Sequence, residues 1–437
     1  MKLLTFIFIF FYSYTGNIFA ELFNASEFRL KNGLKVIVVE NDRAPIVSQM
    51  IWYNVGSVDE EYGKSGLAHF LEHLMFKGTT QFPNGYFSKY ISKNGGSENA
   101  FTSFDYTAYY QIIPSDKVEK IIELESDRMR NLTLTKLQVE TEKKVILEER
   151  YQRIDSSPSA ILDESMRKSL FPNHAYGTPI IGWEHEIESL DYHDVKQFYK
   201  KYYIPSNATL IFSGDISLEK AKRLTKKYFG NINVSEKSID RPILSDPVMK
   251  PNIRINYDHP SVKQKIWKKS YKTKSYIESI KNGIALDIGM KILGGGSTSI
   301  LYDELVKKKK LVSSVGGYYM GMSRDMGTVN LYAIPNENIT VADLESEINN
   351  LMEKAINSGI TEKQFELQKK KYLYDALYLQ DSIFQPAQII GEAVTIGINL
   401  NEIQKWNETL LEISLDDVKS ELKKLLQNKN YVIGILG

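Results

Sequence analysis

The stretch GLAHFLEHLMFKGT, residues 66–79, places His69, Glu72 and His73 in an otherwise apolar run, in a chain with six histidines among 437 residues. The run predicts a helix over residues 66–77. Because each helical residue advances about 100°, both histidines share one face and Glu72 lies on the same side. Two imidazoles so placed can bind one Zn²⁺, and the carboxylate can reach a metal-bound water. The alternative is two ordinary helix histidines beside a glutamate.

The composition limits what else could bind a metal. The chain has no cysteine, which excludes disulfides, thiolate metal sites and cysteine nucleophiles. Any catalytic metal must therefore be held by His, Asp or Glu. Lys and Arg number 55 against 54 Asp and Glu, so no overall field attracts nucleic acid or an anionic membrane, and we expect no nucleic-acid partner.

A catalytic zinc needs a third protein ligand and an open position for water. An acidic residue on a second helix would supply the ligand, and the segment ETEKKVILEER offers Glu140, Glu142, Glu148 and Glu149. Glu142 and Glu149 are seven residues apart and share a helix face, whereas Glu148 points elsewhere. Two carboxylates on one face beside a cationic centre form a coherent pair.

The N-terminal segment MKLLTFIFIFFYSYTGNIFA, residues 1–20, has one positive charge, an apolar stretch and a final small residue, Ala20. This pattern predicts a signal peptide that is cleaved before Glu21 and is too short for a convincing membrane span. The alternative is an uncleaved anchor. Export without disulfides fits a periplasmic protein, with no stable membrane insertion after cleavage.

An internal repeat sets the domain organisation. LTKLQVETEKKVIL at 134–147 and ITEKQFELQKKKYL at 360–373 match at a constant offset of 226, which indicates a duplicated chain. Strands and helices mix without regular βαβ alternation, so the fold class is α+β. We predict an N-terminal domain over 21–233, a polar, proline-containing linker over 234–252 and a C-terminal domain over 253–437.

The motif HFLEH, with the last glutamate of ETEKKVILEE 76 residues after its second histidine, resembles the pitrilysin family of zinc peptidases, the inverzincins. GGSENAFTSFDYTAYY and HAYGTPIIGW are also similar to segments of that family. Within the family the likeness is to mitochondrial processing peptidase and its small bacterial relatives. It spans nearly all of residues 21–437. It implies the pitrilysin-like, LuxS-like metallohydrolase architecture, in which two homologous domains each have a mainly antiparallel sheet packed with helices.

The resemblance also implies roles for individual residues. His69, His73 and Glu149 would hold one Zn²⁺ per chain, and Glu72 would be the general base that activates the water. Glu142 would be a supporting carboxylate near the site. One zinc ion would then activate both the nucleophile, its bound water, and the electrophile, the carbonyl of the scissile peptide bond.

The segment after Gly96 resembles the strand at the sheet edge that pairs with peptide substrates in this family. Asn99, Ala100 and Phe101 are therefore predicted to bind substrate, with Asn99 and Ala100 supplying amide and main-chain hydrogen bonds to an added strand. The alternative is an ordinary buried strand.

The second copy departs from the first. Alignment through its glycine run places Leu286, Gly289 and Met290 where the first copy has its two histidines and glutamate, so the second copy has no metal site. Family members often carry in this half an arginine and a tyrosine that hold the substrate carbonyl and the oxyanion. Here Ile300 and Ser313 stand at those positions.

We therefore expect a zinc endopeptidase that acts on peptides or unfolded segments in an enclosed chamber. Because the arginine and tyrosine are missing, we expect the metal-bearing subunit of a heterodimer whose homologous partner supplies them, or else a homodimer. Two alternatives remain: a non-catalytic assembly subunit of the same fold, and a protein that binds metal without hydrolysis. The intact set of His69, Glu72, His73 and Glu149 argues against the first, and Glu72 against the second.

Overall fold

The computed structural model describes residues 21–232, 239–242, 245–247 and 251–437. The predicted signal peptide and much of the predicted linker lie outside these residues, so both stay predictions. Among the described residues, no helix is long and apolar enough to cross a membrane.

The first half of the described chain builds a sheet of six strands in the order β1-β2-β6-β3-β5-β4. The pair β2 and β6 is parallel and the other pairs are antiparallel. The central strands β3 and β6 are almost fully buried because both faces of the sheet are covered. The strands are β1 (Ala25–Arg29), β2 (Lys35–Glu40), β3 (Ile46–Tyr53), β4 (Ser97–Thr102), β5 (Thr107–Pro114) and β6 (Ala208–Gly214).

The second half repeats this topology. Among the described residues its five strands follow the order β7-β11-β8-β10-β9, in which β7 and β11 form the parallel pair. This order matches β2-β6-β3-β5-β4, so β4 and β9 are equivalent edge strands. The strands are β7 (Ile253–Tyr257), β8 (Ile266–Lys274), β9 (Val312–Met320), β10 (Met326–Pro335) and β11 (Tyr431–Leu436). The predicted duplication and α+β class are confirmed.

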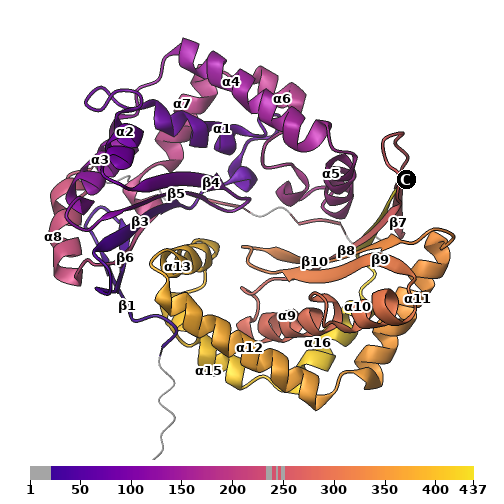
Figure 1. The fold of residues 1–437 in the computed structure, drawn as a ribbon. Coiled ribbons are helices and arrows are strands. Elements are labelled where there is room, and N and C mark those ends of the chain that lie inside the picture. The colour runs from indigo at the N-terminus through magenta and orange to yellow at the C-terminus, as the bar shows by residue number, and fades with distance from the viewer. Residues whose placement is uncertain (1–20, 233–238, 243–244, 248–250) are drawn as a thin grey trace, which may run out of the picture.

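Helices cover the outer faces of both sheets, and the inner faces are turned toward each other (Figure 1). The main helices of the first half are α1 (Leu67–Leu74), α2 (Tyr86–Lys93), α3 (Val118–Asn131), α4 (Lys136–Arg150), α5 (Pro158–Leu170), α6 (Glu184–Ser189), α7 (Tyr192–Tyr202) and α8 (Leu218–Tyr228). Those of the second are α9 (Ile280–Gly294), α10 (Ile300–Tyr302), α11 (Val341–Lys354), α12 (Glu362–Asp381), α13 (Gln385–Ile396), α14 (Leu400–Gln404), α15 (Trp406–Leu411) and α16 (Leu415–Gln427).

The repeat seen in the sequence corresponds to helices α4 and α12. Thr135 caps α4 in a reciprocal capping box with Gln138, and Thr361 caps α12 in the same way with Gln364. The shared threonine and glutamine therefore fix the start of the same helix in both halves.

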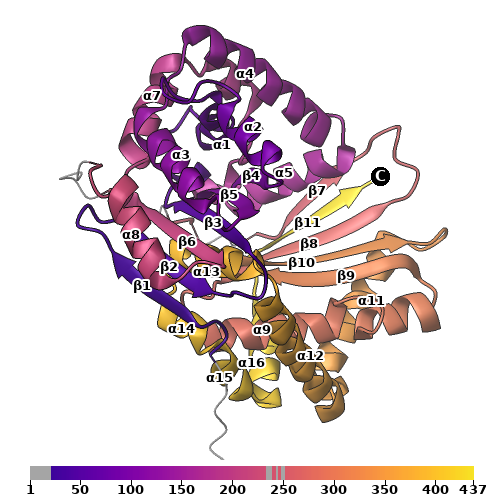
Figure 2. The ribbon, with the colours of Figure 1, turned by 60° about the vertical axis from the view of Figure 1, so that its left-hand side comes forward.

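The two halves exchange helices across their inner faces (Figures 1 and 2). Helix α13 of the second half packs on strands β3 and β6, and α5 of the first half packs on β7, β8 and β11. Glycines allow both close approaches: a Cβ on Gly391 would lie 2.0 Å from the Trp52 indole, and one on Gly434 would lie 2.2 Å from the Met166 sulfur. The halves are thus held together by apolar packing on both sheets.

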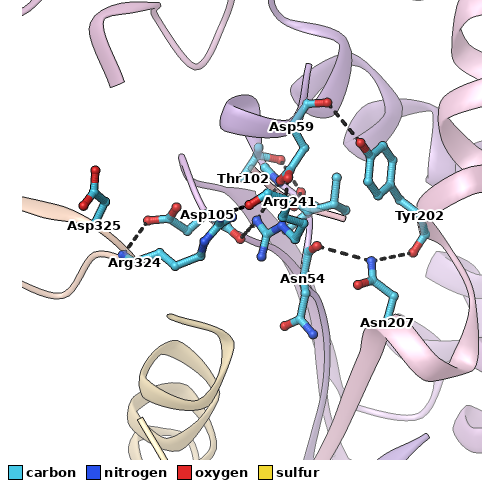
Figure 3. Close-up of polar contacts among 12 residues, drawn as sticks. Asn54, Asp59, Thr102, Asp105, Tyr202, Asn207, Arg241, Arg324 and Asp325 are labelled. Carbon is cyan, nitrogen blue, oxygen red and sulfur yellow. Dashed lines mark hydrogen bonds and ion pairs between the residues drawn. The ribbon is translucent and has the colours of Figure 1, made fainter. Parts of the chain in front are cut away.

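The described part of the linker adds a polar clamp between the halves (Figure 3). The Arg241 guanidinium binds both carboxylate oxygens of Asp59 at 2.7 Å and donates to the Asp105 carbonyl at 2.8 Å. Arg324, in the turn between β9 and β10, donates its N–H to the Asp105 carboxylate at 3.1 Å and its side chain to the Arg241 carbonyl. The linker therefore braces the segment that leads into α1, and the second half braces the turn between β4 and β5.

Candidate metal centre

Helix α1 begins after Gly66, whose backbone is in the left-handed region, with φ of 87°. A Cβ at this position would lie 2.4 Å from the Ile181 carbonyl oxygen, so the turn requires glycine. The Glu60 carboxylate accepts hydrogen bonds from the N–H groups of Gly66 (3.0 Å) and Ala68 (2.8 Å). Burial raises the pKa of Glu60 well above its usual range. The carboxylate satisfies free N–H groups at the helix start and thereby fixes the position of α1.

The three residues predicted to bind metal lie together where α1 packs against the end of α4. Oε2 of Glu149 is 3.6 Å from Nε2 of His69 and 3.4 Å from Nε2 of His73. One candidate ligand atom from each residue lies within 4.8 Å of the others. His69 is buried, and the other two side chains are half-buried.

The two distances from Glu149 to the imidazoles fit a shared zinc ion. Both nitrogen–oxygen distances exceed the roughly 2.7–3.2 Å of an N–H···O hydrogen bond. Two ligands on one tetrahedral zinc, each about 2.0–2.1 Å from the ion, lie about 3.3–3.5 Å apart. Burial, aided by the charge of His73, lowers the pKa of His69 to about 3, so its imidazole is neutral and keeps a lone pair for a metal.

A second carboxylate orients His73. Nδ1 of His73 lies 3.0 Å from Oε1 of Glu142, whose Oε2 accepts from Lys77 at 2.5 Å. The hydrogen bond with His73, supported by Lys77, lowers the pKa of Glu142 to about 2. Glu142 therefore stays ionised and directs Nε2 of His73 toward Glu149. In the described part of the chain, Nδ1 of His69 is buried without a hydrogen-bond partner, so packing alone orients that ring.

Arg153 completes the surroundings of Glu149. Its guanidinium lies 3.0 Å from Oε1 of Glu149, one helical turn away, and its side chain is 71% exposed. The two oxygens of Glu149 thus have separate environments, one facing the imidazoles and one facing a cation. Glu149 and Arg153 are four residues apart in the sequence. This spacing predicts a contact only if the helix continues past Arg150, and here α4 continues into a π-helical turn (Tyr151–Asp155).

Glu72 lies on the same helix as both histidines and is 9% exposed. Its Oε2 accepts a hydrogen bond of 2.6 Å from the hydroxyl of Thr102, at the end of β4. Burial raises the pKa of Glu72, and this hydrogen bond partly offsets the effect. A carboxylate with a raised pKa binds a proton more readily than an exposed one, which suits a group that takes a proton from water beside a candidate metal site.

Strand β4 forms a free edge of the first sheet, in the part of the chain that the structure describes. Ser103 donates its N–H to the Tyr106 carbonyl at 2.8 Å, directly beyond the paired residues of β4 and β5. Hydrogen-bonded and non-hydrogen-bonded pairs alternate along an antiparallel ladder. The N–H and C=O groups of Glu98, Ala100 and Thr102 therefore point toward the open edge.

The three predicted substrate-binding residues differ in their contacts. The Ala100 N–H, which faces the open edge, donates to the side-chain oxygen of its neighbour Asn99 at 2.9 Å. Asn99 is exposed, and the half-buried Phe101 ring packs against Trp52 and Tyr106 on the face opposite α1. A peptide strand at this edge would thus meet the Ala100 main chain after displacing the Asn99 side chain.

In the second half, Ile300 and Ser313 lie on two different elements. Ile300 begins α10 and packs half-buried against the apolar core, and the exposed Ser313 on β9 donates to the Ile334 carbonyl at 3.4 Å. Ile300 has no polar group, and the Ser313 hydroxyl proton is directed to the Ile334 carbonyl, so neither supplies the cationic or phenolic donor of an arginine or a tyrosine.

Comparison with known proteins is consistent with this geometry. The model of insulinase (peptidase family M16) matches residues 35–184, and the model of the peptidase M16 inactive domain matches residues 189–372. The chain is 34% identical over 392 residues to the zinc protease PqqE of Helicobacter pylori, covering 89% of this chain and 87% of that protein.

Two further relatives cover nearly the whole chain. The mitochondrial-processing peptidase subunit beta of Dictyostelium discoideum is 25% identical, over 93% of this chain and 87% of that protein. A crystal structure of a protease from Helicobacter pylori has a TM-score of 0.89 at 30% identity and covers 95% of this chain and 99% of the other.

Proposed function

This chain belongs to the insulinase family of peptidases, family M16, and on that premise we propose that it is a zinc-dependent endopeptidase whose Glu72 is the general base. One observation carries the proposal: candidate ligand atoms of His69, His73 and Glu149 lie within 4.8 Å of one another, and the helix that carries both histidines also presents Glu72. A site that only stored metal would not need a buried carboxylate of raised pKa beside it.

Each residue has a distinct part in the proposed reaction. The two imidazoles and Glu149 hold the zinc, which when bound supplies a Lewis acid and lowers the pKa of water. Glu72 takes a proton from the attacking water and passes it to the leaving amine as the peptide bond breaks. The open edge of β4 aligns an extended peptide as an added strand, beside the helix that carries Glu72.

The variant Glu142→Gln is expected to weaken zinc binding by about 10- to 100-fold, as the loss of a carboxylate behind a metal-binding imidazole does. The amide keeps the size of the side chain but removes the charge that orients His73 and pairs with Lys77. Competition with a chelator of known affinity measures the change.

The control for this variant is Glu140→Gln on the same helix. The Glu140 side chain is 57% exposed and pairs with Lys143 away from the site. Zinc affinity should be unchanged in the control. Equal affinities for Glu142→Gln and the natural chain would remove Glu142 from the metal site.

We further propose that the chain acts as one subunit of a heterodimer that encloses its peptide substrate; a homodimer, the alternative, would not supply the missing arginine and tyrosine. Support comes from Ile300, which has no donor for the charge that develops on the substrate carbonyl, and from Ser313, whose hydroxyl already donates to the Ile334 carbonyl. Loss of one such donor costs about 10²–10³ in turnover in other hydrolases. Export through residues 1–20 lies outside the described residues and stays a prediction.

The experiment that tests both proposals is hydrolysis of a peptide library by the zinc-loaded chain, alone and mixed with a homologous partner that carries the arginine and tyrosine. We expect weak cleavage by the isolated chain and cleavage at least about 10²-fold faster in the mixture. Full activity alone would exclude the need for a partner. Zinc binding without cleavage in either sample would favour an assembly or metal-binding role.

A further inference from the structure

We propose that Thr102 is a positioning residue that holds the base Glu72 and links it to the peptide-binding edge of β4. This inference rests on the proposed function, because it gives a reason why base and edge strand lie side by side. Thr102 meets both at once. Its side chain contacts the carboxylate, and its main chain faces the open edge.

The direction of the hydrogen bond between Thr102 and Glu72 follows from the distances to the acceptors around the Thr102 hydroxyl. Thr102 is paired across the β4–β5 ladder with Thr107, whose hydroxyl lies 3.5 Å away. The fully buried Thr107 already donates its own proton to the Val55 carbonyl at 2.9 Å. Thr107 can therefore only accept from Thr102, and at 3.5 Å it is much the more distant of the two acceptors. The Thr102 proton goes to Oε2 of Glu72 at 2.6 Å, a distance typical of an O–H···O⁻ hydrogen bond.

This hydrogen bond gives the two oxygens of the Glu72 carboxylate different roles. Oε2 is occupied by Thr102, whereas Oε1 has no hydrogen-bond partner within the described part of the chain. Because a carboxylate held at one oxygen cannot rotate freely, Oε1 keeps a fixed direction. That oxygen is then the one available for proton transfer, and its orientation depends on the Thr102 hydroxyl.

The same residue is in contact with the proposed peptide site. In the ladder alternation, the main-chain N–H and C=O of Thr102 point away from β5 toward the open edge. A peptide strand that pairs there would bind the main chain of Thr102, while the Thr102 side chain holds the Glu72 carboxylate. Correct binding and correct base orientation are thereby coupled through one residue.

Two pairs of variants isolate the hydroxyl. In the first pair, the natural threonine has the hydroxyl and Thr102→Val lacks it, while both side chains are branched. In the second pair, Thr102→Ser has the hydroxyl and Thr102→Ala lacks it, and neither side chain is branched. We expect kcat to fall about 10- to 100-fold in Val and in Ala, as for loss of a hydrogen bond to a charged group. The serine variant should stay near the natural rate, with KM and zinc affinity little changed in all four proteins.

The measurement is steady-state kinetics on the assembly that hydrolyses peptide, with Glu72→Gln as the reference and zinc affinity determined in parallel. The assignment would be overturned if Thr102→Val had the same kcat as the natural chain, or if Thr102→Ser were as slow as Thr102→Ala. It would also be overturned if the variants changed KM alone. Should the valine variant not fold, the serine and alanine pair decides alone. Unchanged turnover in Glu72→Gln would instead overturn the proposed function.

Discussion

The variant Glu72→Gln is expected to bind one zinc per chain and to hydrolyse peptide about 10²–10⁴-fold more slowly, the contribution typical of general acid–base catalysis. The amide can still accept the Thr102 hydrogen bond, but it cannot take a proton from water. Folding and metal binding should be kept, because none of the three candidate ligands changes. The effect is measured as turnover at equal zinc content.

A matched control is Glu148→Gln, the same chemical change at an exposed position of α4 that hydrogen-bonds Gln152. The control should turn over like the natural chain. If Glu72→Gln and the control are equally active, Glu72 is not the base.

The second large effect is expected for Glu149→Gln. This change removes the negative charge at the point where both imidazoles converge. Losing a supporting carboxylate lowers zinc affinity by roughly 10- to 100-fold. Losing a ligand should lower it further, so we expect zinc affinity to fall by more than about 100-fold. Hydrolysis should disappear with the metal and return in part at high zinc concentration.

Zinc content after dialysis, with Glu148→Gln again as the control, measures this effect. The comparison is sharp because the two glutamates are adjacent on one helix and only Glu149 faces the histidines. Retention of zinc by Glu149→Gln at the level of the control would contradict the assignment of the third ligand.

Much of the arrangement of the candidate metal centre was predictable because the spacing of residues on a helix is regular. His69 and His73 share a face wherever the helix lies, and the seven-residue separation of Glu142 and Glu149 puts both on the side of α4 that meets α1. The repeat with its shared capping residues likewise revealed the duplication.

Two other residues beside the site, Glu60 and Thr102, were not predictable in this way. Glu60 caps α1 across a loop, and Thr102 reaches Glu72 from strand β4, 30 residues further along the chain. Such contacts depend on how the elements pack, and no periodicity marks them. Lys77 and Arg153 do stand one helical turn from His73 and Glu149, but charged residues at that spacing are common on helix surfaces.

The exchange of α5 and α13 between the halves was also hidden in the sequence. Gly391 and Gly434 mark the two crossings, yet a glycine in a helix or a strand has several possible explanations. Only the position of Trp52 and Met166 opposite them shows that each lets another element approach.

The central claim is that this chain hydrolyses peptides with one zinc held by His69, His73 and Glu149. The most direct test measures zinc content and peptide hydrolysis on one preparation of the active assembly, before chelation, after chelation and after zinc is returned. We predict one zinc per chain, loss of hydrolysis in proportion to the metal removed, and recovery with one equivalent. Hydrolysis that persists in the metal-free protein would contradict the claim.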